Sequence, residues 1–501
     1  MQSAPHDAVV VGSGPNGLAA AIVLARTGRR VLIREAMELA GGGMRSAELT
    51  LPGFVHDVCS TVDPFAVSSP FFSTLPLAEH GLEWVHSPAC VAHPFDDGTA
   101  ALLERSLEAT GATLGPDSEA WRALMEPFVT HWMDLASDVL RPLRMPSSPL
   151  LMARFGLRAI RSADGLARTI FEGERARALF AGNAAHSVFP LTKSPTAAFG
   201  LTLAAAGHAV GWPIVRGGSQ RLADALVSYF RTLGGEIETG APVENIDELD
   251  GTPIIILDLT PRQVLRVVGH ILPARYRRAL QRYRYGAGAF KMDWALDGPI
   301  PWTAPECARA TTMHLGGTLA ELVASERAPL RGEVTERPFV LLAQPTLFDP
   351  SRAPPGGQIA WAYCHVPSGS TVDMTSRIED QIERFAPGFR DRILARSVLP
   401  PGALEAHNSN LVGGDISGGV MDLRQLFFRP VARWTPYATP VEGLYLCSAS
   451  TPPGGAVHGM CGYYAAQAAL GRPLRPPSRG LSASDHALSA TPGGRLRRHP
   501  H

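Results

Sequence analysis

The amino-acid sequence predicts an α/β fold that contains a parallel sheet and is assembled from segments far apart in the chain. A strand-like apolar run ends in a glycine-rich turn near the N-terminus, at residues 7–17, and a second glycine-rich stretch lies at residues 443–462. A site formed from both stretches requires a discontinuous domain that the chain leaves and later re-enters. We expect the residues between them to form a second, α+β domain, since 501 residues are enough for two or three lobes.

The first glycine-rich stretch has the residue order of a dinucleotide-binding, Rossmann-like unit. Its first glycine allows a tight turn, the second lets the backbone approach a pyrophosphate, and the third lets the next helix pack closely on the strand. The phosphates would then lie at the positive end of that helix. The predicted phosphate loop comprises Gly12, Ser13, Gly14, Pro15, Asn16 and Gly17.

A carboxylate follows the second predicted strand. Residues 30–35 form a largely apolar run that ends at Glu35, which is followed by Ala36. A carboxylate in this position accepts hydrogen bonds from ribose hydroxyls. It favours a dinucleotide without a 2′-phosphate, such as FAD or NAD.

The segment after Glu35 distinguishes FAD from NAD. Three glycines at 41–43 permit close backbone approach, and Arg45 can pair with phosphate oxygens. This stretch resembles the GG-x-R segment of the amine oxidase and phytoene desaturase superfamily of FAD enzymes. The resemblance implies an FAD cofactor in a Rossmann-like FAD-binding domain, with the diphosphate covered by Gly42, Gly43, Met44 and Arg45.

Two later segments extend the resemblance. Residues 216–246 have the superfamily's pattern for the return to the FAD domain, and Val243 matches the position whose backbone contacts the adenine. Residues 448–459 resemble the GAGTHPGAGIPG pattern of bacterial carotenoid desaturases, from which Pro452 and His458 depart.

Residues 51–60, 290–302 and 457–462 carry a narrower resemblance, to phytoene desaturase-related enzymes in the pyridine nucleotide-disulfide oxidoreductase domain-containing protein 2-like group. It runs from Asp7 to about Leu470. Amine oxidases usually have an acidic residue where this chain has Ala449. The substrates of the resembled group are poorly defined, so the resemblance implies fold and cofactor more firmly than reaction.

The glycines of the C-terminal element predict a second contact with the cofactor. A loop at 454–459 that enters a helix would direct backbone N–H groups at flavin N1 and C2=O, where the reduced flavin carries negative charge. We expect His458 to touch the flavin or to line the substrate cavity. The cofactor-binding residues expected here are Ser448, Ala449, Gly455, Val457, Gly459 and Met460.

Lys291 is the other candidate catalytic residue. It lies in a strand-like run at 289–296 that is followed by Pro301 and Trp302. This run resembles the monoamine oxidase strand whose lysine holds a water against flavin N5 and aids reaction with oxygen. A cation there would favour electron transfer to O2. The alternative is a lysine at the edge of a strand, facing solvent.

These segments divide the chain into two domains and a tail. The predicted FAD-binding domain comprises residues 1–82, 216–285 and 430–472. The predicted substrate domain comprises residues 83–215, expected to be helical, and 286–429, expected to be a sheet with helices. Residues 473–501 are rich in Pro, Ser, Gly and Arg and are expected to form a disordered tail.

Composition and residue spacing argue against several other classes of protein. Lys and Arg together number 46, as do Asp and Glu, so no basic excess indicates nucleic acid. The six cysteines lack the close pair of disulfide reductases, and the histidines lack metal-ligand spacing, so we expect reduced thiols and no metal. The first strand begins within ten residues of the N-terminus, which leaves no room for a signal peptide and predicts a cytoplasmic protein.

The most apolar stretch, residues 196–215, contains His208 and Pro213 and is better interpreted as a buried or ligand-lining helix than as a membrane span. Peripheral contact with a membrane stays open, as does the oligomeric state.

The resemblance implies a dehydrogenase or desaturase that moves hydride from a hydrophobic substrate, such as an isoprenoid or polyene, to flavin N5. O2 or a quinone is the expected acceptor, because the sequence has no separate NAD(P) motif. Three alternatives stay open: an amine or amino-acid oxidase, a redox-neutral isomerase, and a non-catalytic lipid-binding protein of the same fold, as in Rab GDP dissociation inhibitors.

Overall fold

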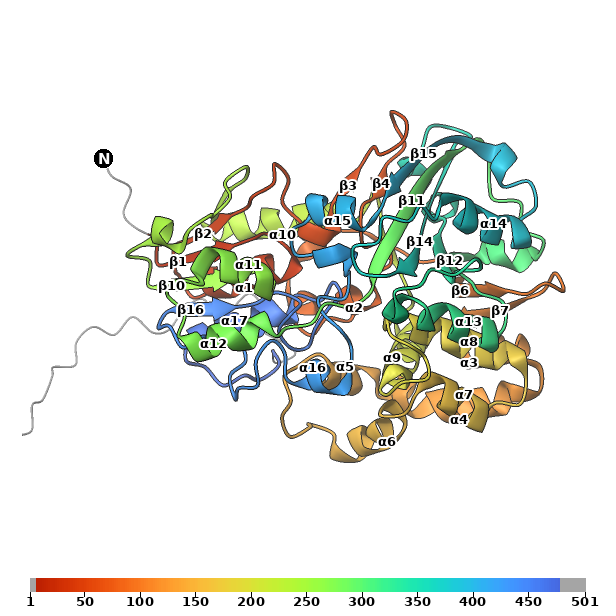
Figure 1. The fold of residues 1–501 in the computed structure, drawn as a ribbon, viewed down its shortest axis with the longest axis horizontal. Coiled ribbons are helices and arrows are strands. Elements are labelled where there is room, and N and C mark those ends of the chain that lie inside the picture. Colours follow the sequence, from red (N-terminus) through yellow and green to blue (C-terminus); the bar gives the residue numbers. More distant parts are fainter. Residues whose placement is uncertain (1–5, 478–501) are drawn as a thin grey trace, which may run out of the picture.

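Three separate parts of the chain supply the five parallel strands of one sheet. The computed structural model describes residues 6–477, so most of the predicted tail at 473–501 lies outside the described residues. This sheet lies on the left of Figure 1, and its strand order is β16–β10–β1–β2–β9. The strands are β1 (Ala8–Val11), β2 (Val31–Arg34), β9 (Glu236–Glu238), β10 (Ile254–Leu257) and β16 (Leu444–Leu446). The predicted α/β fold with a discontinuous parallel sheet is confirmed.

Helices cover both faces of this sheet, which explains why its central strands are uninterrupted apolar runs. Ala8 and Val10 point to the face covered by helices α1 (Pro15–Ala25), α10 (Gln220–Thr232) and α17 (Met460–Ala469). Val9 and Val11 point to the opposite face, which packs on α11 (Pro261–Val268) and α12 (Ala274–Gln281).

A second sheet of seven strands lies to the right in Figure 1, in the order β15–β11–β14–β13–β12–β6–β7. Its long strands are β11 (Gly288–Leu296) and β14 (Gln358–Val366), which pair antiparallel along their whole length. The others are β6 (Ala89–Pro94), β7 (Ala100–Glu104), β12 (Ala310–Leu315), β13 (Val340–Ala343) and β15 (Ile393–Leu399).

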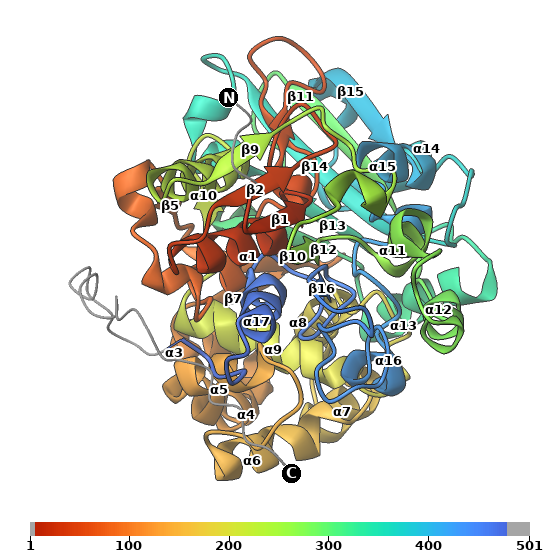
Figure 2. The same ribbon diagram turned by 90° about the vertical axis from the view of Figure 1, so that its left-hand side faces the viewer.

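One face of this second sheet is covered by a lobe of helices, seen below it in Figures 1 and 2. These helices are α3 (Leu107–Ala112), α4 (Ser118–Thr130), α5 (Trp132–Val139), α6 (Pro149–Ala159), α7 (Ala163–Ile170), α8 (Glu174–Ala185) and α9 (Thr196–Ala209). The other face packs on α14 (Thr375–Phe385). The remaining helices are α2 (Pro64–Val67), α13 (Leu319–Arg327), α15 (Pro401–His407) and α16 (Leu423–Phe427).

The segment expected to be helical, 83–215, also contributes strands, which corrects that expectation. A hairpin of β6 and β7 turns at Asp97 and Gly98, and β6 pairs in parallel with β12. β5 (Trp84–Val85) and β8 (Ile214–Val215) pair with each other at the two ends of the segment. The strand signal was weak because β6 is buried at every position, so it lacks the polar–apolar alternation of a half-exposed strand.

Close contact between α1 and α17 joins the two ends of the chain. A Cβ added at Gly462 would lie 1.7 Å from the backbone oxygen of Asn16, so only glycine permits this approach. The contact places the loop before α17 directly beside the phosphate loop before α1.

We expect Gly462→Ala to lower the free energy of unfolding by at least about 2 kcal/mol, because a backbone oxygen cannot move aside without shifting a whole helix. The midpoint of urea unfolding followed by circular dichroism measures this change. Gly402→Ala is the matched control, since a Cβ at Gly402 in α15 meets no atom within 4 Å. Equal midpoints for the two variants would contradict the packing argument.

Candidate functional site

A cavity of about 620 Å³ lies where the two domains meet. Its walls include the carboxyl ends of β1, β2 and β10, which is where ligands bind in open parallel sheets. The walls continue onto the second sheet at Lys291 and Trp361 and onto helix α9 at Phe199. One space therefore connects the phosphate loop with the apolar helical lobe.

Most of the predicted cofactor-binding residues line this cavity. They are Gly12, Ser13, Gly14, Pro15, Asn16, Glu35, Ala36, Gly42, Gly43, Arg45, Val243, Ser448, Ala449, Gly455 and Val457. Gly17, Met44, Gly459 and Met460 lie behind the wall instead. Gly17 and Gly459 permit close packing of backbone, and the Met44 and Met460 side chains belong to the core beneath α1.

The two N-terminal glycine loops form a cradle that side chains would fill. A Cβ at Gly42 would lie 2.9 Å from Cα of Gly14, and the φ of 55° at Gly42 also favours glycine. Gly41 N–H donates to Ser13 O at 3.1 Å, which holds the loops together. This cradle beside the N-terminus of α1 fits a diphosphate.

Glu35 lies at the end of β2 and is 8% exposed. Its carboxylate accepts hydrogen bonds from Ser13 N at 2.8 Å and from Met37 N at 2.9 Å. These bonds fix the carboxylate at the cavity wall, where it can accept from ribose hydroxyls.

The Arg45 guanidinium is held at the cavity by two carbonyl groups. Nε donates to Gly42 O at 3.0 Å and Nη2 to His407 O at 2.7 Å, which leaves other N–H donors for phosphate oxygens. Burial lowers the pKa of Arg45, and the charge of Glu35 raises it. A buried guanidinium with free donors fits an anionic ligand.

Asp258 at the end of β10 is a site residue that sequence reasoning missed. Its Oδ2 accepts from Gly17 N at 3.0 Å and lies beneath Gly14. Burial raises the pKa of Asp258 to about 7, against the lowering effect of the Gly17 hydrogen bond. Below that pH the carboxyl is mostly neutral and does not repel a diphosphate. Its signal in the sequence is an acid directly after the apolar run 254–257.

Lys291 reaches the cavity wall and is held from behind by a buried chain of polar groups. Its Nζ pairs with Asp293 Oδ2 at 2.5 Å, and Asp293 Oδ1 lies 3.5 Å from His56 Nδ1. His56 Nε2 lies 2.8 Å from Thr50 Oγ1, and Lys291 Nζ lies 5.7 Å from the Trp361 ring centroid. The alternative of a solvent-facing lysine does not hold, because Lys291 is 3% exposed.

Burial and the charge of Lys291 shift the pKa values of the two polar side chains behind it, Asp293 and His56. Burial raises the pKa of Asp293 to about 6, although the neighbouring Lys291 charge lowers it. Burial lowers the pKa of His56 to about 3, and the Lys291 charge lowers it further. Asp293 follows Lys291 by two residues on β11 and so shares its face. His56 comes from a distant segment that no local pattern linked to Lys291.

His458 does not lie in the cavity wall. Its Nδ1 accepts a hydrogen bond from Met460 N at 3.0 Å, at the N-terminus of α17, and the side chain is fully buried. Burial lowers the pKa of His458 to about 4, so the ring is neutral and can accept that bond. The ring caps the N-terminus of α17. It does not line the cavity, which was one of the two positions that the sequence predicted for it.

The far end of the cavity is mainly apolar. Phe199, Leu203, Trp212 and Leu341 form its walls, and Val188 lies among them. Two non-glycine residues in the described range 6–477 have a positive φ, Val188 at 50° and Ala456 at 133°, and both line this cavity. Such backbone strain persists only where the surroundings hold it, and it gathers at functional sites.

Two ionisable residues accompany these apolar walls. His186 Nε2 lies 3.0 Å from His314 Nε2, and burial lowers the pKa of His186 to about 3, which keeps the ring neutral. Burial raises the pKa of Asp63 to about 7, with a further contribution from Asp57. At neutral pH this end of the cavity thus offers a neutral imidazole and a partly protonated carboxyl group between apolar surfaces.

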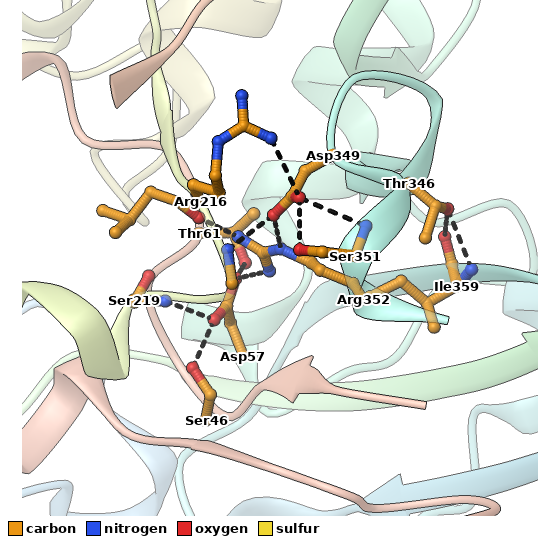
Figure 3. Close-up of polar contacts among 12 residues, drawn as sticks. Ser46, Asp57, Thr61, Arg216, Ser219, Thr346, Asp349, Ser351, Arg352 and Ile359 are labelled. Atoms are coloured by element: carbon orange, nitrogen blue, oxygen red, sulfur yellow. Dashed lines mark hydrogen bonds and ion pairs between the residues drawn. The ribbon is translucent and has the colours of Figure 1, made fainter. Parts of the chain in front are cut away.

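A buried ion network connects three parts of the chain behind the site (Figure 3). Arg352 Nη1 pairs with Asp57 Oδ2 at 2.5 Å and Nε with Asp349 Oδ2 at 3.1 Å. Asp57 Oδ1 also accepts from Ser219 N at 2.8 Å, and Asp349 Oδ2 accepts from Gly217 N at 2.6 Å. The network therefore anchors residues 217–219, where the chain leaves the helical lobe and re-enters the parallel sheet.

Known proteins match this fold and its N-terminal phosphate loop. A family profile described as an NAD(P)-binding Rossmann-like domain matches residues 10–64. Wild-type putrescine oxidase bound to putrescine has a TM-score of 0.60 with this chain at 16% identity, and the alignment covers 94% of this chain and 100% of that one. At this identity the likeness shows a shared fold.

Two sequence relatives match nearly the whole chain. The mouse (Mus musculus) pyridine nucleotide-disulfide oxidoreductase domain-containing protein 2 is 28% identical over 554 residues, covering 92% of each chain. The neurosporene-forming phytoene desaturase of Rhodobacter capsulatus is 26% identical over 511 residues, covering 91% of this chain and 92% of that one. The chain is thus similar over most of its length to relatives named as oxidoreductases and desaturases, and it shares the fold of putrescine oxidase.

Residues 6–477 contain no group of three or more His, Cys, Asp or Glu side chains that could hold a metal ion. Over the same range, every helix is too short or too polar to cross a membrane.

We expect Arg352→Met to lower the free energy of unfolding at pH 7 by about 3–5 kcal/mol, because two buried carboxylates lose their counter-charge. Burial alone would raise the pKa values of Asp57 and Asp349, but Arg352 and hydrogen bonds lower them below 3.8. Their stabilising contribution is therefore complete above about pH 4 and is lost at lower pH. The difference between variant and wild type should shrink in acid.

Urea unfolding between pH 3 and 8 measures both effects. Arg377→Met is the control, because Arg377 pairs with Glu336 at the surface, where an ion pair contributes less than about 1 kcal/mol. A cost for Arg352→Met no larger than that of the control would contradict the role assigned to the network.

Proposed function

We propose that this protein is an FAD-dependent dehydrogenase or desaturase that moves hydride from a hydrophobic substrate, such as an isoprenoid or polyene, to flavin N5. The observation that carries the proposal is the cavity whose walls include both the phosphate-loop glycines and the apolar side chains Phe199, Leu203 and Trp212. Sequence similarity to phytoene desaturases supports the substrate class.

The chain's own residues would hold each part of FAD. Glu35 would accept hydrogen bonds from the ribose hydroxyls, and Val243 would lie beside the adenine. The N-terminus of α1 and Arg45 offset the diphosphate charge. Backbone of residues 455–457, which lines the cavity just before α17, would stabilise negative charge on the flavin ring.

When bound, FAD would supply the two-electron redox chemistry, and the cavity residues would bind and orient the substrate. Two electrons and two protons would leave the substrate as a C=C or C=N bond forms. O2 would take them up to give hydrogen peroxide, or a quinone would take them up to give a quinol.

Lys291 would favour O2 as the acceptor. A fixed positive charge at the cavity wall lowers the cost of moving negative charge onto oxygen. Asp293 holds the Lys291 ammonium in place, and His56 and Thr50 continue the polar chain away from the cavity. This arrangement also favours the second candidate, an oxidase of amines or amino acids.

The first test is the visible spectrum of the purified full-length protein, before and after denaturation. We expect a flavin spectrum and release of free FAD. Glu35→Gln should weaken FAD binding about tenfold, because a charged acceptor for the ribose hydroxyls is lost. Glu238→Gln is the matched control, a carboxylate at the end of the neighbouring strand that does not line the cavity.

A colourless protein that also fails to bind added FAD would refute the enzyme proposal and favour lipid binding. Turnover with conversion of one double-bond isomer to another, without net electron transfer, would favour an isomerase. Peroxide release with amines would favour the amine oxidase.

We expect Lys291→Met to slow reoxidation of the photoreduced flavin by O2 at least about tenfold, since the positive charge at the cavity wall is lost. Asp293→Asn should slow it less, because the lysine keeps its charge but loses its fixed position. Stopped-flow absorbance after mixing with air-saturated buffer measures the rate without any substrate.

Glu326→Gln is the control for the loss of a buried carboxylate, because Glu326 pairs with His365 away from the cavity lining. Wild-type reoxidation rates in Lys291→Met would remove Lys291 from the oxygen reaction and point to a quinone as the acceptor.

A further inference from the structure

One face of helix α6 presents apolar side chains to solvent. Leu150 is 88% exposed and Leu157 is 75% exposed. They are seven residues apart and therefore lie on the same face of the helix, and the exposed Ile160 follows at its C-terminal end. The opposite face of the helix carries Phe155 and Ala159, which are buried in the lobe. The helix is therefore apolar on two sides, only one of which the described chain covers. It lies at the lower edge of the molecule in Figures 1 and 2.

More exposed apolar side chains lie nearby. Met145, in the loop before α6, is 84% exposed, and Trp434 is 98% exposed. Leu143, Met145 and Trp434 line one surface groove together with Arg141 and Arg144. Large apolar side chains gathered in this way mark an interaction surface rather than scattered surface residues.

The charge of this surface has one sign. Residues 139–163 contain five arginines, at 141, 144, 154, 158 and 161, and no Asp or Glu. Arg141 pairs with Asp138, but the ion pairs formed within residues 6–477 include none to Arg144, Arg154 or Arg158. Partial burial lowers the pKa of Arg158, and the Arg154 charge lowers it further.

The same helix is connected to the cavity. α6 packs against α9, and Phe199 and Leu203 of α9 line the apolar end of the cavity. A partner bound at α6 would therefore lie one helix away from the substrate walls.

We propose that α6, the loop at 141–145 and Trp434 form a docking surface for an anionic lipid membrane. Leucines and a tryptophan flanked by arginines match the two parts of a membrane interface, the acyl boundary and the negatively charged headgroups. Charge argues against the C-terminal segment 478–501 as the occupant, because it contains four arginines and one acid and would be repelled. Charge also argues against a second copy of this basic surface.

Vesicle co-sedimentation of the full-length protein tests the proposal. The probes are vesicles of phosphatidylcholine alone and vesicles with about 30 mol% phosphatidylglycerol. We expect binding to the anionic vesicles at least about tenfold tighter than to neutral ones, weakened by salt. Leu150→Gln/Leu157→Gln should reduce binding at least about tenfold. Arg154→Gln/Arg158→Gln should reduce both the binding and its dependence on salt.

Leu394→Gln is the matched control, because Leu394 on the edge strand β15 is also exposed and apolar but lies in another part of the fold. Size-exclusion chromatography of each variant reports folding and self-association. Failure to bind anionic vesicles, or equal binding by the Leu150/Leu157 variant and the control, overturns the proposal. Loss of a dimer in that variant without vesicle binding would assign the surface to a second copy.

Removal of residues 478–501 completes the test. Binding that is lost in the truncated protein but kept in the Leu150/Leu157 variant would assign lipid binding to the C-terminal segment and overturn the proposal. Since vesicle binding requires neither FAD nor substrate, its failure is distinguishable from failure of the proposed oxidoreductase function, which the flavin spectrum reports.

Discussion

The buried guanidinium of Arg352 is the contact on which the arrangement of the two domains depends. It lies between Asp57, which belongs to the N-terminal part of the chain, and Asp349, which follows the second sheet's strand β13. Removing three charges from water is costly, and such a cluster is tolerated only when nearly every donor and acceptor is used. Here Val215 O accepts from Arg352 Nη2. The two carboxylates also accept from the hydroxyls of Ser46 and Thr61 and from the backbone N–H groups of Gly217 and Ser219.

This network and the cavity share a wall. Thr61 donates to Asp57 at 2.9 Å and also lines the cavity, so the ion cluster supports the surface that would contact a bound ligand. On the opposite side, glycine contacts between the N-terminal loops and between α1 and α17 fix the phosphate cradle. The cavity is thus held by the Arg352 ion network and by the close glycine contacts of α1, α17 and the phosphate loop. Neither set of contacts tolerates much displacement.

The sequence predicted those parts of the site whose signal is local. Gly12, Gly14 and Glu35 belong to one strand–helix–strand unit, so their spacing alone indicated their roles. Arg352, Asp258 and His56 escaped prediction because each acts through a partner that is distant in the sequence. The contact of Arg352 with Asp57 joins residues 295 positions apart. His458 was expected to touch the flavin or to line the cavity. The structure places its ring behind the cavity wall, where it accepts a hydrogen bond from Met460 N at a helix N-terminus.

The position of β16 in the sheet bears on the order of events during synthesis. β1 and β16 flank β10 in the parallel sheet, yet roughly 430 residues separate them, which corresponds to about 20–90 seconds of translation at about 5–20 residues per second. Throughout that interval one edge of the nascent sheet is unpaired and the face of α1 that receives α17 is bare. Until β16 and α17 have been synthesised, the cavity is also incomplete, because Ser448 and residues 455–457 belong to its wall.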